Sequence, residues 1–201
     1  MRIRIPSWFI LCCLVGVVVL NACTPYPDNL TSECGIPPVI VPTLPAFIPE
    51  EFELDPSTNL HKSGTPQLID VNAYTLEITG LVDQPLSLSY DQLRCMPKVT
   101  DTVTLVCPQT FIDNAEWSGV RLAYILKLAG VQEGATNVRM RGADGYYANI
   151  SLEDAIRPES FLAYEWEGEP LPIMHGFPLR AVLPEIYGSQ WVKWLLEIEI
   201  E

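Results

Sequence analysis

Four side chains in the second half of the sequence are of types that can bind a metal ion or an anion. Cys107 ends the apolar run Leu105-Val106-Cys107, and a thiolate at a strand end is a soft metal ligand with a fixed geometry. His175 and Arg180 bound one Gly/Pro-rich run, and Lys193 follows before a tryptophan. A guanidinium fork and an ammonium bind phosphates and other anions, and an imidazole can hydrogen-bond the same ligand.

Each of these residues also has an ordinary structural interpretation. Cys107 could be a small buried hydrophobic residue or a disulfide partner, and a lone histidine such as His175 is often structural. The cations could instead form ion pairs with neighbouring acids, Glu185 or Glu197. Three aromatic residues either border a pocket above the metal or belong to the core: Phe111, Trp117 and Tyr146.

Most segments around these residues alternate between apolar and polar side chains, as strands do, and fewer show the 3.6-residue period of a helix. Ser89 with Gln92, and Ser151 with Asp154, predict the starts of two short helices, and Gly130 predicts the end of a third. Strands outnumber helices, so we expect an α+β domain that is mostly β with short helices. The expected strands are 74–78, 102–107, 138–140, 146–147, 162–166 and 194–200, and the third helix covers 122–129.

Seven motifs in order resemble the molybdopterin-binding domain of the sulfite oxidase family, over about residues 70–201. The resemblance implies the sulfite-oxidase-type molybdopterin-binding fold. The motifs are Gly80 to Leu88, the strand ending at Cys107, Trp117 to Leu122, Asp144-Gly145-Tyr146, Leu162 to Pro172, His175 to Arg180, and Tyr187-Gly188 with Lys193-Trp194.

The resemblance also implies a role for each candidate residue. Cys107 would be the catalytic thiolate on molybdenum, while His175, Arg180 and Lys193 would hold the pterin. The cofactor would then supply the redox chemistry, and the protein would supply orientation and electrostatics. These roles describe a molybdopterin-dependent oxidoreductase that transfers an oxygen atom. Because the sequence has no Cys-x-x-Cys-His motif, electrons would pass through a separate haem or membrane partner.

The segment after Cys107 differs from the sulfite oxidase pattern. Family members that bind sulfite carry arginines near this cysteine, whereas this chain has Pro108-Gln109-Thr110-Phe111-Ile112-Asp113. An anionic substrate would find an acid there and no cation. We therefore expect a substrate other than sulfite, such as a neutral sulfoxide or N-oxide.

The N-terminus resembles a bacterial lipoprotein signal peptide over residues 1–22. Arg2 and Arg4 precede an apolar run over 8–20 that is too short to span a bilayer, and Leu20-Asn21-Ala22-Cys23 ends it. Cys23 would be lipidated, anchoring the protein to the membrane outside the cytoplasm. The alternatives, an ordinary signal peptide or an uncleaved anchor, lead to the same side of the membrane.

The same segment raises an alternative function. Molybdopterin is inserted in the cytoplasm, and exported members of the family use a twin-arginine signal that carries folded protein. Arg2-Ile3-Arg4 lacks adjacent arginines. The molybdenum cofactor would then be absent from the mature protein, leaving a cofactor-free surface lipoprotein that acts as a ligand- or protein-binding module.

Composition limits the partners and the redox state. Loss of Arg2 and Arg4 leaves 10 basic against 25 acidic residues, a formal charge of −15, which makes nucleic acid a poor partner.

Residues 23–69 are rich in proline, which predicts an extended tether between the lipid and the domain. His61 lies in this segment, and the sequence assigns it no function. In an oxidising compartment we expect Cys34 to pair with Cys95, leaving Cys107 free, although spacing alone does not fix the connectivity.

Overall fold

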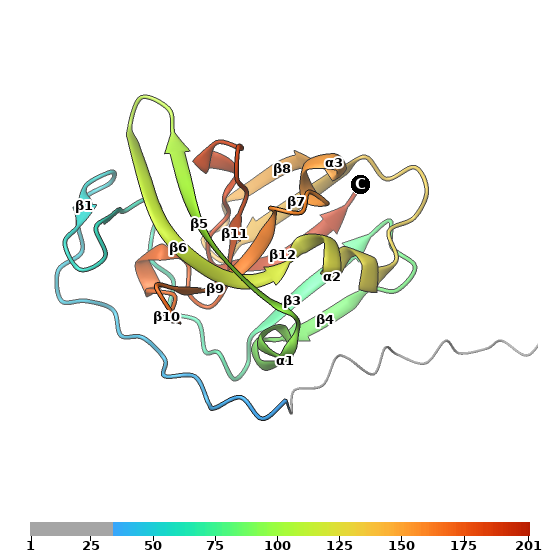
Figure 1. The fold of residues 1–201 in the computed structure, drawn as a ribbon, viewed down its shortest axis with the longest axis horizontal. Helices are drawn as coiled ribbons and strands as arrows, with labels where there is room; N and C mark the ends of the chain where they lie inside the picture. The colour runs from blue at the N-terminus through green and yellow to red at the C-terminus, as the bar shows by residue number, and fades with distance from the viewer. Residues whose placement is uncertain (1–33) are drawn as a thin grey trace, which may run out of the picture.

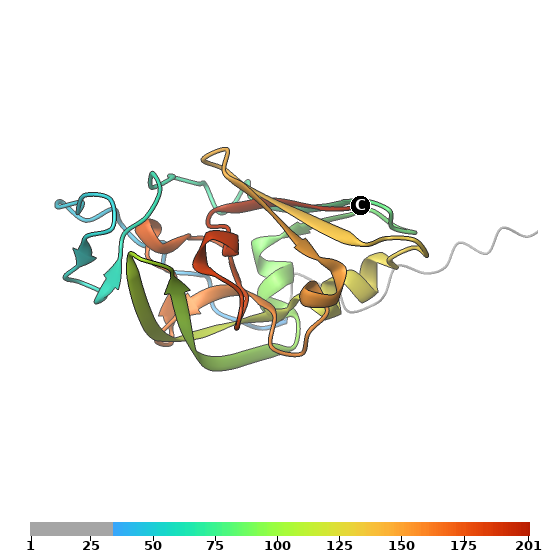
Figure 2. The same cartoon turned by 90° about the horizontal axis from the view of Figure 1, so that it is seen from above.

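Two five-stranded sheets and a small two-stranded hairpin make up residues 34–201, the part of the chain that the computed structural model describes. The predicted signal peptide 1–22 and the lipidation site Cys23 lie outside these residues. Seen from above, the two sheets form separate layers (Figure 2). None of the helices in this part of the chain is long and apolar enough to cross a bilayer.

The first sheet has the order β4-β3-β12-β7-β8 (Figure 1). Its central strand, β12 (Leu195–Ile200), runs parallel to β3 (Thr75–Gly80) and antiparallel to β7 (Asn137–Gly142). The outer strands are β4 (Leu86–Ser89) and β8 (Tyr147–Ser151). The prediction of a paired C-terminal strand is confirmed. Its buried side chains are Leu195, Ile198 and Ile200, because a register shift between Leu195 and Glu197 interrupts the expected alternation at Leu196.

The second sheet has the order β10-β9-β6-β5, with β11 also paired to β9. Strands β5 (Lys98–Cys107) and β6 (Phe111–Arg121) form the long hairpin that projects from the body in Figure 1. The remaining strands are β9 (Phe161–Trp166), β10 (Glu169–Pro170) and β11 (Arg180–Val182). Sequence patterns predicted neither β6 nor β11. The Asp, Asn, Glu and Gly residues of β6 disfavour a strand, but full pairing with β5 overrides that preference.

Three short α-helices complete the domain: α1 (Tyr90–Cys95), α2 (Leu122–Ala129) and α3 (Leu152–Ala155). The predicted capping box at α1 is present, since Ser89 Oγ accepts from Gln92 N while Gln92 Oε1 accepts from Ser89 N. Gly130 ends α2 in a left-handed conformation, as predicted. Two 3-10 helices, η1 (Ile173–His175) and η2 (Gly188–Gln190), carry much of the candidate site.

One hydrophobic core lies between the sheets and the helices. Its largest fully buried side chains include Trp117, Tyr164 and Trp194. These rings come from β6, β9 and the segment before β12, so the core joins both sheets. The predicted α+β class, mostly β with short helices, is confirmed.

Part of the segment predicted as a tether, 23–69, folds against the domain. Residues 50–64, called the strap below, contain the hairpin of β1 (Leu54–Asp55) and β2 (Leu60–His61). Backbone hydrogen bonds between Phe52 N and Lys62 O and between Lys62 N and Glu53 O, both 2.8 Å, extend this pairing. The sequence did not predict this hairpin for two reasons. The proline content favoured an extended tether, and the hairpin is stabilised by contacts with β6 and η1, which are remote in sequence.

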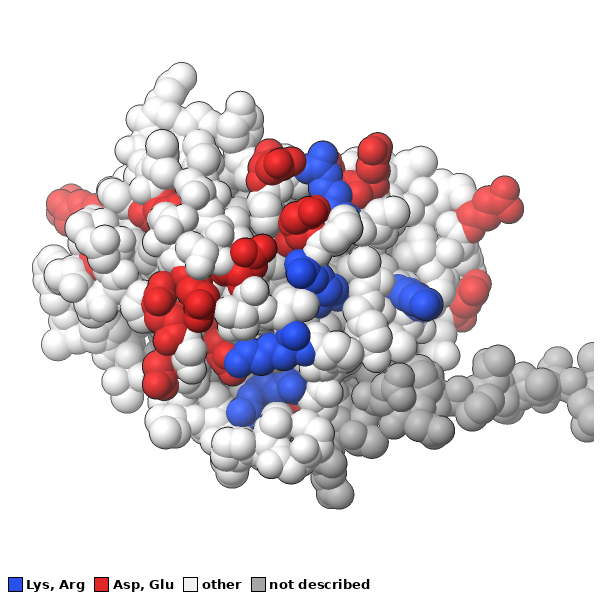
Figure 3. All heavy atoms as spheres, viewed as in Figure 1, with Lys and Arg blue, Asp and Glu red and all other residues white. Residues whose placement is uncertain are grey.

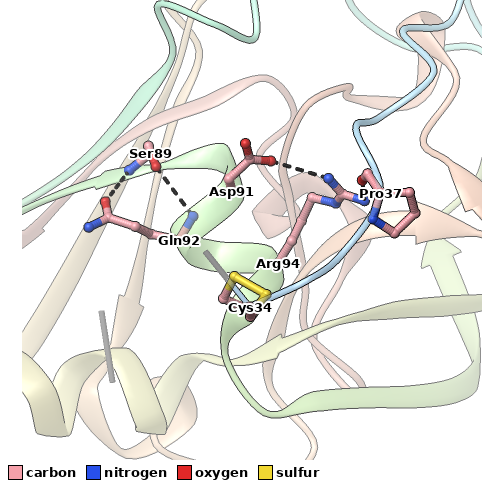
Figure 4. Close-up of a disulfide and its surroundings, with 7 residues drawn as sticks. Cys34, Pro37, Ser89, Asp91, Gln92 and Arg94 are labelled. Atoms are coloured by element: carbon pink, nitrogen blue, oxygen red, sulfur yellow. Dashed lines mark hydrogen bonds and ion pairs between the residues drawn. A yellow bond between two sulfur atoms is a disulfide. The ribbon is translucent and has the colours of Figure 1, made fainter. Parts of the chain in front are cut away.

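A disulfide between Cys34 and Cys95 fixes the chain ahead of the strap to α1, with Cα atoms 5.6 Å apart (Figure 4). Beside it, Arg94 donates to Pro37 O at 3.0 Å and pairs with Asp91 at 3.2 Å. The predicted pairing is confirmed, and among the described cysteines Cys107 is free. The alternative in which Cys107 is a disulfide partner is therefore wrong.

Charged side chains on the outer face of the first sheet neutralise one another. Arg141 pairs with Glu197 at 2.7 Å and Arg139 with Glu199 at 3.4 Å, across β7 and β12. On the face drawn in Figure 3, Lys and Arg side chains lie among acidic ones and form no continuous basic stripe. That face offers a nucleic acid backbone no positive surface.

Replacing Cys95 with Ser should lower the free energy of unfolding by about 2–4 kcal/mol, because the disulfide closes a loop with a sequence separation of 61. Urea unfolding of both proteins without reductant measures the difference. Adding reductant should bring the wild type to the stability of Cys95→Ser. Equal stabilities before reduction would contradict the account.

Candidate functional site

A cavity of about 300 Å³ opens between the tip of the β5–β6 hairpin, the strap, and the segment from η2 to β12. Trp191 and Trp194 form its buried base, while Cys107 and Lys193 are half-buried in its wall. Two of the four predicted site residues therefore meet in one cavity. The full lining is Glu51, Phe52, Ser63, Gly64, Cys107, Asp144, Tyr146, Gly188, Ser189, Trp191, Lys193 and Trp194.

Cys107 is held at the tip of the hairpin by strand pairing. It lies opposite Phe111 in the β5–β6 register, and Thr110 closes the turn by donating its N–H to Cys107 O at 3.1 Å. The alternation of β5 directs Val103, Leu105 and Cys107 to the same side, which is the inner face. A free thiol at this position enters the cavity with its backbone fixed, as a metal ligand requires.

Lys193 is a cation without a carboxylate partner among residues 34–201. Its Nζ donates to Ser63 O in the strap and to Met174 O, the latter at 3.1 Å, and lies 4.7 Å from the centre of the Trp194 ring. Burial, and next the charge of Arg180, lower the pKa of Lys193 to about 7. An anion in the cavity would stabilise the protonated form.

Arg180 lies behind the cavity wall, 4 % exposed. Its guanidinium packs 4.6 Å from the centre of the Trp117 ring and 5.7 Å from that of Trp191, and Nη1 donates to His175 O at 3.1 Å. Burial lowers the pKa of Arg180 to about 10. The cation adds positive potential beneath the cavity and fixes the end of η1.

His175 also lies behind the cavity, in η1, and is 2 % exposed. Its Nε2 lies 3.1 Å from Asp55 Oδ2 and 2.9 Å from Thr58 Oγ1, both in the strap. Burial, followed by the charge of Lys193, lowers the pKa of His175 to about 4, so the ring is neutral at pH 7. Because the Asp55 carboxylate accepts the proton of Nε2, Nδ1 is left as a hydrogen-bond acceptor.

A second histidine–carboxylate pair joins the strap to the hairpin. His61 Nδ1 lies 2.6 Å from Asp113 Oδ1, and His61 N donates to Asp113 Oδ2 at 2.9 Å. The His61 ring stacks on Phe111 at 4.6 Å. Sequence patterns assigned His61 no role, although Asp113 carried a signal: it is an acid at an inward-facing position of an alternating strand, and such a buried acid needs a partner.

The predicted ion pairs of the cations with local acids are wrong. Glu185 pairs with Arg157, and Glu197 with Arg141. Within the described residues, Arg180 and Lys193 bind backbone carbonyls and aromatic faces instead. Of the three aromatic candidates, Tyr146 lines the cavity, whereas Phe111 and Trp117 are core residues beside it.

Gly188 serves packing against the hairpin. A Cβ at this position would lie 2.7 Å from Leu105 Cδ2, so a larger residue would require the Leu105 side chain to move. In the structure its close neighbour is the protein itself.

Comparison with known families identifies this arrangement. The model of the oxidoreductase molybdopterin-binding domain matches residues 62–201, more than half of the chain. The chain belongs to this family. The match includes Cys107, Lys193 and the segments between them, so most of the cavity lining lies within the family's domain. It begins at Lys62, inside the strap, and leaves Glu51 and Phe52 outside.

Individual relatives agree with this assignment. An uncharacterized oxidoreductase, YuiH of Bacillus subtilis, is 37 % identical over 142 residues, which are 70 % of this chain and 71 % of YuiH. Mitochondrial sulfite oxidase of Macaca fascicularis is 37 % identical over 66 % of this chain and 30 % of its own length. The sulfane dehydrogenase SoxCD from Paracoccus pantotrophus superposes with a TM-score of 0.64 at 28 % identity, over 71 % of this chain and 41 % of that chain. This chain thus spans less than half of the sulfite oxidase and SoxCD chains.

The Lys193 pKa makes stability depend on pH in the cofactor-free protein. The folded-state pKa of about 7 lies below the unfolded value near 10.5, so the unfolded chain binds more protons between these values. The free energy of unfolding should therefore rise with pH from 7 towards 10.5. Lys193→Met should remove this rise, which urea unfolding at pH 7, 8 and 9 would reveal. Parallel pH profiles for the two proteins would refute the assignment.

Proposed function

We propose that this chain is a molybdopterin-dependent oxidoreductase that transfers an oxygen atom to or from a substrate other than sulfite. The observation that carries the proposal is the cavity in which a free thiol, Cys107, faces a lysine that has no carboxylate partner in residues 34–201. A soft metal ligand and an uncompensated cation are the two groups that a metal-bearing anionic cofactor requires.

The residues present fit the molybdenum cofactor. Cys107 would bind the metal, and Lys193 would bind the anionic part of the pterin. Arg180 would contribute positive potential from beneath and hold η1 in place through His175 O. His175, fixed by Asp55 and Thr58, would offer Nδ1 as an acceptor to the pterin. The fit rests on buried positive charge that the protein leaves unneutralised, which is costly unless a ligand completes it.

The cofactor, when bound, supplies a metal that exchanges an oxygen atom and two electrons with a substrate. In the reductive direction, an S-oxide or N-oxide loses its oxygen, takes up two electrons and two protons, and leaves water beside the deoxygenated product. The electrons come from a separate haem or membrane protein. Support for such a partner comes from relatives whose names describe multi-part systems, including a putative protein-methionine-sulfoxide reductase subunit of Azospira oryzae, 29 % identical over 63 % of this chain and 48 % of that protein.

The cavity is unsuited to sulfite. Lys193 is the one Lys or Arg among its lining residues. In our proposal Lys193 binds the cofactor, so it is not available to bind sulfite. The carboxylate of Asp144 lines the same space and repels a dianion. In the segment after Cys107, the acid Asp113 is bonded to His61 and supplies no positive charge.

We also propose that the protein is a lipoprotein outside the cytoplasm, with a signal peptide at 1–22 and a lipid on Cys23. Of the segment 23–69 expected as a tether, only the part ahead of the Cys34–Cys95 disulfide would serve as one, because the strap belongs to the domain. The Cys34–Cys95 disulfide supports this location, because disulfides persist in oxidising compartments. The net charge makes binding to anionic lipid by a polybasic patch unfavourable, so the acyl chains would provide the attachment.

The oxidoreductase proposal is tested by Cys107→Ser. With reduced viologen as the electron donor and methyl phenyl sulfoxide as a first substrate, the wild type should turn over, and the variant should lose at least about a thousandfold in rate, since a hydroxyl replaces the thiolate ligand. The thermal unfolding midpoint should stay within about 2 °C, because the half-buried side chain changes little in volume. Unchanged turnover in the variant would refute the role of Cys107.

The lipoprotein proposal is tested by Cys23→Ser. Wild-type protein should sediment with membranes and show a diacylglyceryl-cysteine N-terminus by mass spectrometry, and the variant should lose the lipid. Ser32→Ala, in the same segment, serves as a control that keeps the lipid. A wild-type protein that carries no lipid on Cys23 would contradict the proposal.

A further inference from the structure

Two aromatic side chains stand at the open side of the cavity. Phe52 and Tyr146 are each 48 % exposed, whereas Trp191 and Trp194 at the base are at most 3 % exposed. Phe52 comes from the strap, and Tyr146 comes from the turn between β7 and β8. They belong to different elements, yet both line the space that Cys107 enters.

Phe52 is held in place before any ligand arrives. Its N–H donates to Lys62 O at 2.8 Å, and its backbone adopts φ +66°, a left-handed conformation that bulky residues rarely adopt. Its ring centre lies 6.1 Å from that of Phe111, the residue opposite Cys107 in the hairpin. Left-handed backbone costs free energy for a phenylalanine, so the position is maintained by the pairing around it.

Tyr146 is fixed by two hydrogen bonds. Its hydroxyl donates to Ser189 O at 2.6 Å, and its N–H donates to Asp144 Oδ1 at 3.0 Å. The first bond ties the β7–β8 turn to η2 across the cavity rim. The phenol is consequently not available as a strong donor to a substrate, and what it presents is an aromatic ring.

The charges beside these rings are acidic. Glu51 lies next to Phe52 in the strap, and its carboxylate pairs with Lys62 at 2.8 Å, which neutralises its charge. Asp144 accepts from the Tyr146 N–H and forms no ion pair within residues 34–201. Lys193 donates to Ser63 O and Met174 O and forms no ion pair within residues 34–201. The outer part of the cavity therefore combines apolar rings with negative charge.

We propose that Phe52 and Tyr146 select the substrate, admitting uncharged molecules that carry an aromatic or alkyl group beside the transferable oxygen, while the unpaired carboxylate of Asp144 repels anions. The inference deepens the proposed function and rests on it for the position of the reacting oxygen. Glu51 and Phe52 lie outside the region 62–201 that the family model matches. Asp144 and Tyr146 lie within that region, so the proposed selectivity combines the strap with the turn between β7 and β8.

The test is a matched pair of ligands of the same size: methyl phenyl sulfoxide, which is neutral, and benzenesulfinate, which is an anion. Binding to the full chain purified from its own host is followed by the fluorescence of Trp191 and Trp194 in the cavity base. The sulfoxide should bind at least about tenfold more tightly, a difference of about 1.4 kcal/mol. Equal affinities, or tighter binding of the anion, would overturn the charge selectivity.

Variants test the two rings. Phe52→Ala and Tyr146→Ala should each weaken sulfoxide binding by about threefold to tenfold, which is the effect expected for losing one aromatic contact. The controls are Phe47→Ala and Tyr147→Ala, which remove equally large rings that are 64 % and 60 % exposed and do not line the cavity. Their affinities should match the wild type. Wild-type affinity in both Phe52→Ala and Tyr146→Ala would overturn the inference.

Three further measurements distinguish failure of the proposed selectivity from failure of the proposed function. Phe52→Leu, which keeps an apolar side chain, should retain most of the affinity, and thermal unfolding confirms that each variant is folded. Molybdenum content is measured on the same samples. If the protein contains molybdenum but sulfoxide affinity does not depend on Phe52 or Tyr146, the selectivity is refuted and the proposed function is not. Ring-dependent binding in protein without metal supports the selectivity and refutes the proposed function.

Discussion

Two neighbouring cations, the buried Arg180 and the half-buried Lys193, form no ion pair within residues 34–201, and this is the constraint on which the site depends. Arg180 and Lys193 lie close enough for the charge of Arg180 to lower the pKa of Lys193. Indole faces and backbone carbonyls stabilise them only in part, because neither neutralises the charge. Such an arrangement is costly in the absence of an anion, and it therefore indicates what the cavity binds.

The rest of the fold places the Cys107 thiol and the strap beside these two cations. The β5–β6 hairpin carries Cys107 to the cavity from the second sheet, while β12 and the segment before it carry Lys193 from the first. The strap then bonds to both parts through His61–Asp113 and Asp55–His175. The disulfide at Cys34 attaches the chain ahead of the strap to α1, so both ends of the strap are anchored to the domain.

Local patterns in the sequence were sufficient for much of the fold. Alternation located β3, the second half of β5 and β12, and side-chain caps located α1 and α3, because these signals lie within a few residues of each other. Strand β6 was missed because long-range pairing stabilises it against poor propensity. The strap was missed for a related reason, since its contacts join residues more than fifty positions apart. Motif order indicated the four candidate residues, but only the tertiary structure separates Cys107 and Lys193, in the cavity, from His175 and Arg180, behind its wall.

The central claim is that the cavity holds a molybdenum cofactor, and metal analysis of the mature protein tests it most directly. The protein is purified from the membranes of its own host, and molybdenum is measured by elemental mass spectrometry against protein concentration. The account predicts close to one molybdenum atom per chain. Folded protein with the Cys34–Cys95 disulfide formed but without molybdenum would contradict it, and would instead support a cofactor-free binding module built on the same fold.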